Sequence, residues 1–159
     1  MPTSTQIQEA EQEVAQLATT CATANELMAA IVKLLHRKMP HYNWVGFYML
    51  EEPGPVLQLG FFEGAPTPHT RIPLNQGICG AAVSQGETVV VDDVSSDPRY
   101  LACSIETKSE IVAPVFADGQ VVGELDVDSH TPAAFALEDR RLIEYCASVV
   151  GKHLENAGS

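Results

Sequence analysis

The chain has 159 residues, of which 45% are hydrophobic and 19% are charged, so its composition is that of one globular domain and not of a disordered protein. Its formal net charge of −12 argues against nucleic acid and anionic membranes as partners, because both require clustered Lys and Arg, and the chain has nine in all. The start of the chain has neither a basic nor an apolar segment, and no run reaches the roughly 18 apolar residues of a membrane span, so we expect a cytoplasmic protein.

The N-terminal region is predicted to form two helices. Apolar residues recur at helical spacing between residues 7 and 21, with Gln and Glu between them. A second helix is expected over residues 25–38, and Pro40 ends it. Cys21 lies between these helices and is interpreted as a core thiol.

The middle of the chain changes to the alternation that is typical of strands. Strands are predicted over residues 43–50, 56–64, 69–74 and 88–93, with a short helix before Gly86. Residues 94–109 are too polar and too Pro-interrupted for regular structure. Residues 110–129 predict a hairpin with Asp118 and Gly119 in its tight turn, and a last helix follows at about 135–155, with Cys146 in its apolar stripe.

This order of elements predicts a single α+β domain over residues 1–159, with helices at about 3–39 and 135–155 and a sheet with loops at about 42–130. The terminal helices should cover one face of a mostly antiparallel sheet. The other face must be covered by the middle loops or stay in contact with water.

Side chains alternate across a strand, so the sequence also predicts which residues share the loop-covered face. Val121, Leu125 and Val127 are expected on the helix side, and Glu124 on the opposite side. The residues expected to face the loops that carry Cys79 and Cys103 are Trp44, Tyr48, Glu110, Asp126 and Asp128.

Each of these residues also has an ordinary structural explanation. Acidic residues on one strand face usually form a solvated surface, paired aromatic residues usually pack, and an isolated cysteine is more often inert than reactive. The four cysteines show no C-x-x-C spacing, so no metal site is expected. Gathered in one pocket, however, these groups favour binding of a small zwitterion with an oxidised sulfur.

The chemistry of such a pocket follows from its groups. Asp126 and Asp128 would bind an ammonium group, and Trp44 and Tyr48 would pack a thioether. A Cys103 thiolate would attack the oxidised sulfur, while a crowded carboxyl with a raised pKa, at Glu110 or in the Asp pair, would supply a proton. The resulting sulfenic acid needs a second thiol. Acidic surroundings oppose a thiolate, and we expect the helix start after Gly77 to offset this.

The segments NWVGFYML, TRIPLNQGICGAAV, LACSIETKSEIVAPVF and GELDVDS resemble a stand-alone GAF domain, and more narrowly the free methionine-(R)-sulfoxide reductases, over about residues 41–136. The resemblance implies a six-stranded antiparallel sheet with helices on one face and a loop-covered ligand pocket on the other, in a homodimer. It implies reduction of free L-methionine (R)-S-oxide with no resident cofactor, and thioredoxin as the external reductant. By motif, the catalytic cysteine is Cys103, a second cysteine is Cys79, the pocket carboxylates are Glu110, Asp126 and Asp128, and the aromatic wall is Trp44 and Tyr48.

One position departs from the family pattern. Many members carry a further cysteine ten residues before Cys79, where this chain has His69. Either Cys79 or an external thiol must then reduce the sulfenic acid at Cys103. Two other functions stay open at this point: a non-enzymatic GAF sensor of a small ligand, and a thiol redox sensor in which Cys79 and Cys103 form a regulatory disulfide.

Overall fold

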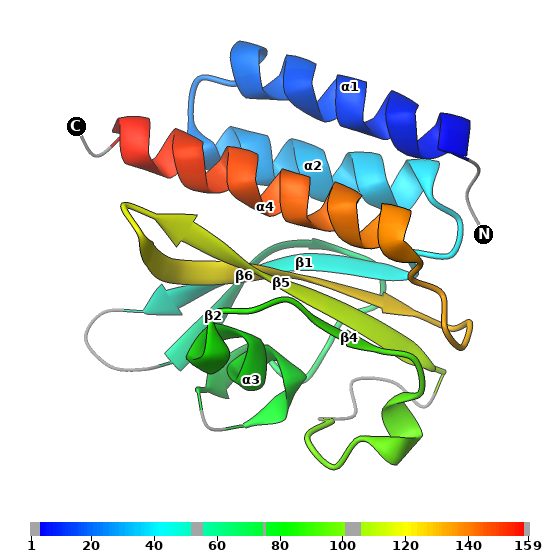
Figure 1. Ribbon diagram of the computed structural model, residues 1–159. Coiled ribbons are helices and arrows are strands. Elements are labelled where there is room, and N and C mark those ends of the chain that lie inside the picture. Colours follow the sequence, from blue (N-terminus) through cyan, green and yellow to red (C-terminus); the bar gives the residue numbers. More distant parts are fainter. Residues whose placement is uncertain (1–3, 52–55, 75, 101–105, 158–159) are drawn as a thin grey trace.

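The computed structural model describes residues 4–51, 56–74, 76–100 and 106–157. A six-stranded antiparallel sheet has the helices α1, α2 and α4 on one face and the short helix α3 on the other (Figure 1). The predicted α+β architecture, with the terminal helices on one face, is confirmed.

The helix layer is built from α1 (Ser4–Thr20), α2 (Ala24–Lys38) and α4 (Leu137–Ala157). Thr23 caps α2 by accepting a hydrogen bond from the Glu26 N–H, and basic residues fill the last turn, where they interact favourably with the helix dipole. Helices α2 and α4 contact the sheet, and α1 packs mainly against these two helices (Figure 1). Cys21 lies half-buried in the α1–α2 connection.

The strands are β1 (Trp44–Glu51), β2 (Val56–Glu63), β3 (Arg71–Pro73), β4 (Val89–Val91), β5 (Ser109–Ala117) and β6 (Gln120–Ser129), in the spatial order β3-β2-β1-β6-β5-β4. The strands β1, β6 and β5 therefore form the centre of the sheet. Helix α3 (Gly77–Gln85) connects β3 to β4. A 3-10 turn at Val94–Ser96 lies in the segment for which no regular structure was predicted.

The β5–β6 hairpin has the predicted turn, since Asp118 and Gly119 both have positive φ, at 53° and 78°. Beyond the turn the register shifts, because Val115 pairs with Gly123 whereas Phe116 pairs with Val121. Val121 consequently packs with the cluster on the α3 side of the sheet, and its predicted position beside Leu125 and Val127 was wrong.

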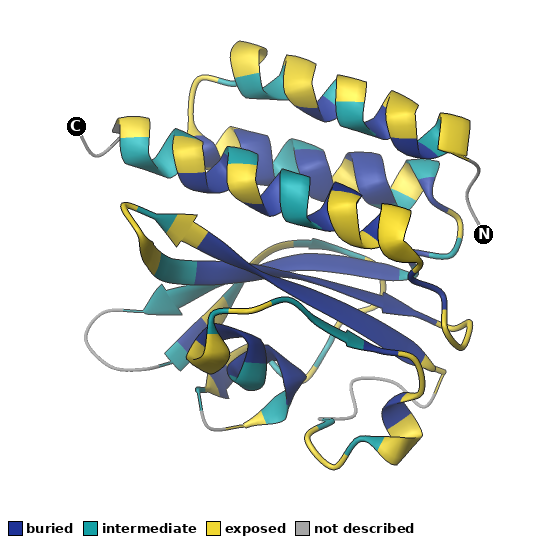
Figure 2. Ribbon diagram, in the orientation of Figure 1, coloured by how far each residue is buried: buried dark blue, intermediate teal, exposed yellow. Residues whose placement is uncertain are grey.

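Two apolar clusters cover the two faces of the sheet. The larger one lies between the sheet and the helix layer and includes the fully buried Cys146, as predicted. The second lies between the sheet and α3. Figure 2 shows the central strands as buried, whereas yellow, exposed positions lie on the outer surface of the helices. Within the described residues, no helix combines the length and apolarity needed to cross a bilayer.

Candidate active site

The predicted site residues are brought together by the register of the three central strands. On the α3 side of the sheet, Trp44 pairs with Asp128, which in turn pairs with Glu110. In the next rows of the same face, Gly46 pairs with Asp126, and Tyr48 pairs with Glu124. The alternation read from the sequence therefore placed these side chains on the correct face.

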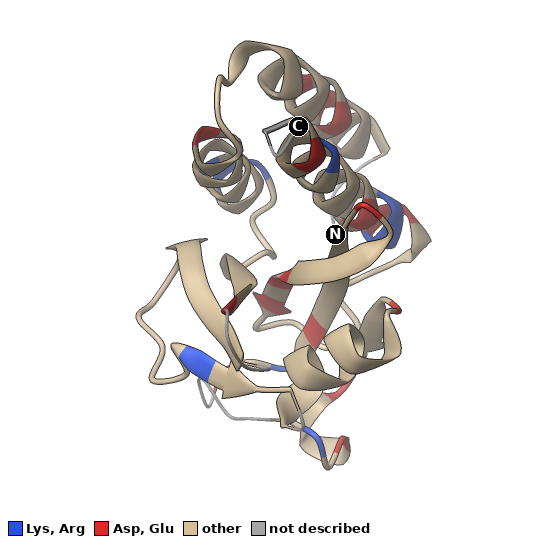
Figure 3. Cartoon of the chain, turned by 90° about the vertical axis from the view of Figure 1, so that its left-hand side faces the viewer, with Lys and Arg blue, Asp and Glu red and all other residues tan. Residues whose placement is uncertain are grey.

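The carboxyl groups on this face are inside the protein. Glu110, Glu124, Asp126 and Asp128 are exposed by only 5%, 0%, 2% and 3%, so the interpretation as a solvated strand surface is wrong. None of the nine Lys and Arg residues is buried. Figure 3 shows acidic positions on the strands in the middle of the molecule. The protein thus buries several acidic groups without a buried basic side chain among them.

Burial makes these carboxyl groups hard to ionise. It raises the pKa of Glu110 well above the ordinary value, and the neighbouring Asp126 raises it further. Burial, followed by the charge of Glu110, has the same effect on the pKa of Asp128. For Glu124, burial raises the pKa from 4.5 to about 8. A raised pKa favours the protonated form of a carboxyl group, which is able to donate a proton.

The Cys79 thiol lies at the centre of this acidic group. Cys79 is in the first turn of α3. The close packing of this helix on the chain that follows β3 is evident at Gly80, where a Cβ atom would lie only 2.7 Å from the Leu74 carbonyl oxygen. The buried thiol donates a hydrogen bond to Asp126 Oδ2 at 3.5 Å. Burial, then the charges of Asp126 and Glu124, raise the pKa of Cys79 well above its usual value. The expectation that the helix start favours a thiolate concerned Cys103, which lies outside the described residues.

The aromatic pair forms one wall of the site and also anchors the loop after β2. Trp44 and Tyr48 have ring centroids 6.1 Å apart. The Trp44 indole N–H donates to the Ala65 carbonyl oxygen at 3.0 Å, and the Tyr48 hydroxyl donates to the His69 carbonyl oxygen at 2.7 Å. The indole ring lies over Gly46, where a Cβ atom would be 2.8 Å from Trp44 Cζ3. A side chain at Gly46 would therefore displace the wall.

Two small cavities adjoin these residues. One has a volume of about 10 Å³ and is lined by Tyr48, His69, Cys79, Glu110 and Asp126, among others. The second has a volume of about 160 Å³, and Trp44 and Asp128 are part of its lining. The predicted site residues within the described part of the chain thus line two neighbouring hollows, of which the first is much the smaller.

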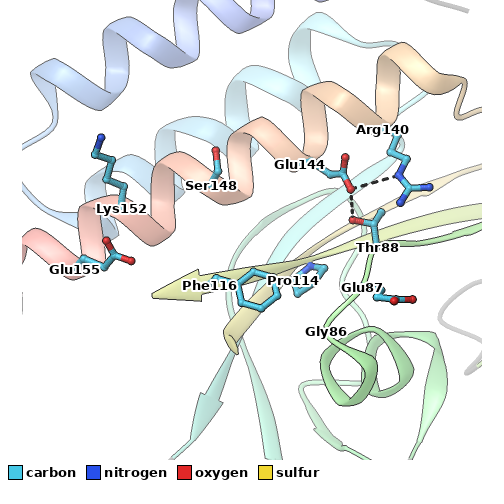
Figure 4. Close-up of a pocket in the computed structure, with 10 residues that line it drawn as sticks. All are labelled: Gly86, Glu87, Thr88, Pro114, Phe116, Arg140, Glu144, Ser148, Lys152 and Glu155. Carbon is cyan, nitrogen blue, oxygen red and sulfur yellow. Dashed lines mark hydrogen bonds and ion pairs between the residues drawn. The ribbon is translucent and has the colours of Figure 1, made fainter. Parts of the chain in front are cut away.

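A larger groove of about 680 Å³ lies elsewhere, beside α4 (Figure 4). Its wall carries Phe116 and the charged residues Arg140 and Glu144, and Thr88 donates a hydrogen bond to Glu144 at 2.6 Å. None of the predicted site residues that the structure describes lines this groove, so the groove and the predicted chemistry are separate.

The predicted nucleophile, Cys103, lies outside the described residues. The strand that follows it does place Glu110 next to Asp128.

Residues 11–154 match the GAF domain family. The chain belongs to that family. A structure of the type II free methionine-R-sulfoxide reductase from Thermoplasma acidophilum is 39% identical, with a TM-score of 0.79 over 88% of this chain and 96% of that one. The structure of free methionine-R-sulfoxide reductase from Neisseria meningitidis in complex with its substrate is 30% identical, with a TM-score of 0.91 over 100% and 96% of the two chains. The free methionine-R-sulfoxide reductase of Escherichia coli is 37% identical over 68% of this chain and 64% of that protein.

The predicted relationship of this GAF domain to the free methionine-(R)-sulfoxide reductases is thereby confirmed. Glu124 is a further residue of the site, which was not predicted as such from the sequence. Glu124 was placed on the correct face by alternation, but only the structure shows that it is fully buried and interacts electrostatically with Cys79.

Proposed function

We propose that this GAF domain reduces free L-methionine (R)-S-oxide to methionine, with Cys103 as the attacking thiol and Cys79 as the resolving thiol. The observation that carries the proposal is a buried thiol hydrogen-bonded to one of four buried carboxyl groups, beside an aromatic wall, in a chain that is 30 to 39% identical to reductases of known structure.

The buried carboxyl groups of Glu110, Glu124, Asp126 and Asp128, called the acidic rows below, give a reason for selecting the free amino acid. A substrate ammonium group supplies the positive charge that these carboxyl groups lack, and it would lower the pKa of each carboxyl that it contacts. A methionine sulfoxide residue inside a peptide has no such ammonium group. Trp44 and Tyr48 offer apolar ring surface to the methyl and thioether end.

The first step transfers one oxygen atom. The Cys103 sulfur attacks the sulfoxide sulfur, the S–O bond breaks, and the products are methionine and a sulfenic acid on Cys103. The substrate sulfur gains two electrons, and Cys103 loses two. A protonated carboxyl, at Glu110 or Asp128, would donate a hydrogen bond or proton to the departing oxygen.

The second step forms a disulfide and water. The Cys79 sulfur bonds to the Cys103 sulfur and displaces the hydroxyl group, which takes up the proton of the Cys79 thiol. The attacking species is the thiolate, so the raised pKa of Cys79 slows this step unless the thiol proton moves to the departing hydroxyl group as the S–S bond forms. A dithiol of the thioredoxin class would then reduce the disulfide, so we propose no resident cofactor.

The test is stereospecific turnover. The reduced protein is incubated with free R-sulfoxide and a thioredoxin system, and methionine is measured; the S epimer and an R-sulfoxide peptide are the comparison substrates. We expect turnover of the free R form alone, none in Cys103→Ser, and about one methionine per protein in Cys79→Ser. Cys21→Ser, far from the acidic rows, is the matched control and should retain activity. Full activity in Cys103→Ser would falsify the mechanism, and ligand-induced stabilisation without turnover would indicate a sensor instead.

A further inference from the structure

The hollow at Cys79 has the dimensions of a site for a single ion. The Cys79 sulfur and carboxylate oxygens of Glu110 and Asp126 all lie within 4.8 Å of one another, and all three residues are buried. The cavity that they help to line has a volume of about 10 Å³, which is about the space of one water molecule. A monatomic cation fits into this space.

A second observation is a buried carboxyl group close to the thiol. Glu124 is fully buried, and within the described part of the chain neither of its carboxyl oxygens has a partner at hydrogen-bonding geometry. Its charge nevertheless acts on both Cys79 and Glu110, so the carboxyl belongs to the same cluster. None of the Lys and Arg residues is buried to neutralise it. Buried acidic groups in this state require protons or an external cation.

We propose that the cluster of Cys79, Glu110 and Asp126, with Glu124 beside it, binds one divalent cation of the zinc class. A thiolate combined with carboxylates favours Zn²⁺ over Mg²⁺ and Ca²⁺, because the latter two take oxygen ligands. The sequence predicted no metal site, since its cysteines lack C-x-x-C spacing. The structure assembles the ligands from three separate elements instead: Cys79 from α3, Glu110 from β5 and Asp126 from β6.

The binding has a consequence for catalysis, which rests on the proposed function. The metal would occupy the resolving thiol together with two carboxyl groups proposed to handle the substrate's ammonium group and a proton. Zn²⁺ would therefore inhibit turnover, and free methionine sulfoxide would compete with it. Binding of the metal itself does not depend on the reductase activity.

Cobalt provides a direct test, because Co²⁺ is a spectroscopic substitute for Zn²⁺. The reduced, metal-free protein is titrated with Co²⁺. We expect a near-ultraviolet charge-transfer band from the Cys79 sulfur, saturation at one ion per chain, and displacement by Zn²⁺. Cys79→Ser should lose the band, and Glu110→Gln should weaken affinity at least about tenfold, the lower limit seen even for groups outside the ligand set. Circular dichroism establishes that each variant is folded.

Two cysteine variants serve as controls. Cys21→Ser and Cys103→Ser should both keep the band, because the proposed sulfur ligand is Cys79. A band that persists in Cys79→Ser, a band that disappears in Cys103→Ser, or no uptake at millimolar Co²⁺ and Zn²⁺ would each overturn the proposal. Glu124→Gln gives a second measure that leaves the sulfur in place, and unchanged affinity in both Glu124→Gln and Glu110→Gln would also contradict it. Turnover of the metal-free protein is measured separately, so a protein that binds Co²⁺ but reduces no sulfoxide would refute only the proposed function.

Discussion

Glu124 should make the stability of the protein fall as pH rises. Its carboxyl is fully buried, and its pKa rises from 4.5 to about 8 on folding. Between these values the unfolded chain releases the proton while the folded protein keeps it, so the free energy of unfolding decreases with pH. The contribution is fully present below about 4.5 and is lost as pH approaches about 8.

The size of the effect follows from the difference between the two pKa values of Glu124. Each pH unit between them lowers the free energy of unfolding by about 1.4 kcal/mol, which gives about 5 kcal/mol over the whole range. Glu124→Gln removes the ionisable group while keeping its shape. We therefore expect the variant and the parent protein to be of similar stability near pH 4.5, and the variant to be more stable by up to about 5 kcal/mol near pH 8.

Urea denaturation at several pH values, with a thiol reductant and EDTA present, measures this difference. Glu87→Gln, a substitution at an exposed glutamate, is the control, and subtracting its effect isolates the contribution of burial. If the free energies of unfolding of Glu124→Gln and the parent protein run parallel from pH 4.5 to 8, Glu124 does not bind its proton more tightly in the folded state, and the reasoning is refuted.

Three further substitutions test the aromatic wall and the start of α4. Gly46→Ala should push the Trp44 ring aside, which would shift the emission of the only tryptophan and lower kcat/KM by about 100-fold; unchanged emission would contradict the crowding. Tyr48→Phe removes a 2.7 Å hydrogen bond to the loop after β2 and should lower the free energy of unfolding in urea by about 0.5–1.5 kcal/mol. The variant should also have a higher KM, and an unaltered KM would mean that the loop does not position substrate. Tyr42→Phe removes a 2.6 Å hydrogen bond to Asp139 and should cost about 1.5–3 kcal/mol while leaving KM unchanged, so a raised KM would place this contact in the site after all.

Alternation along the strands was sufficient to predict the face of the site. Trp44, Asp128 and Glu110 come from three strands, yet each faces α3 as its position in the pattern requires. The prediction failed at Val121, because a register shift reverses the alternation and leaves no clear signal in the residue types.

Burial was the property that the sequence did not predict. A row of acidic residues on one strand is ordinary on a solvated sheet, and only the packing of α3, with Cys79 against Asp126, turns it into a desolvated cluster. The same tertiary effect raises the pKa of Cys79, since desolvation and nearby charges depend on contacts between distant segments.

Each central strand carries the hydrophobic core on one side and the site on the other. In β1, Val45 and Phe47 pack beneath the helices, while Trp44 and Tyr48 flank this pair in sequence and face α3. A change that moves this strand to suit a new ligand would also disturb the packing on its reverse side. New specificities should therefore evolve more readily through α3 and the segments around it, where altered contacts leave the core between the sheet and the helix layer intact.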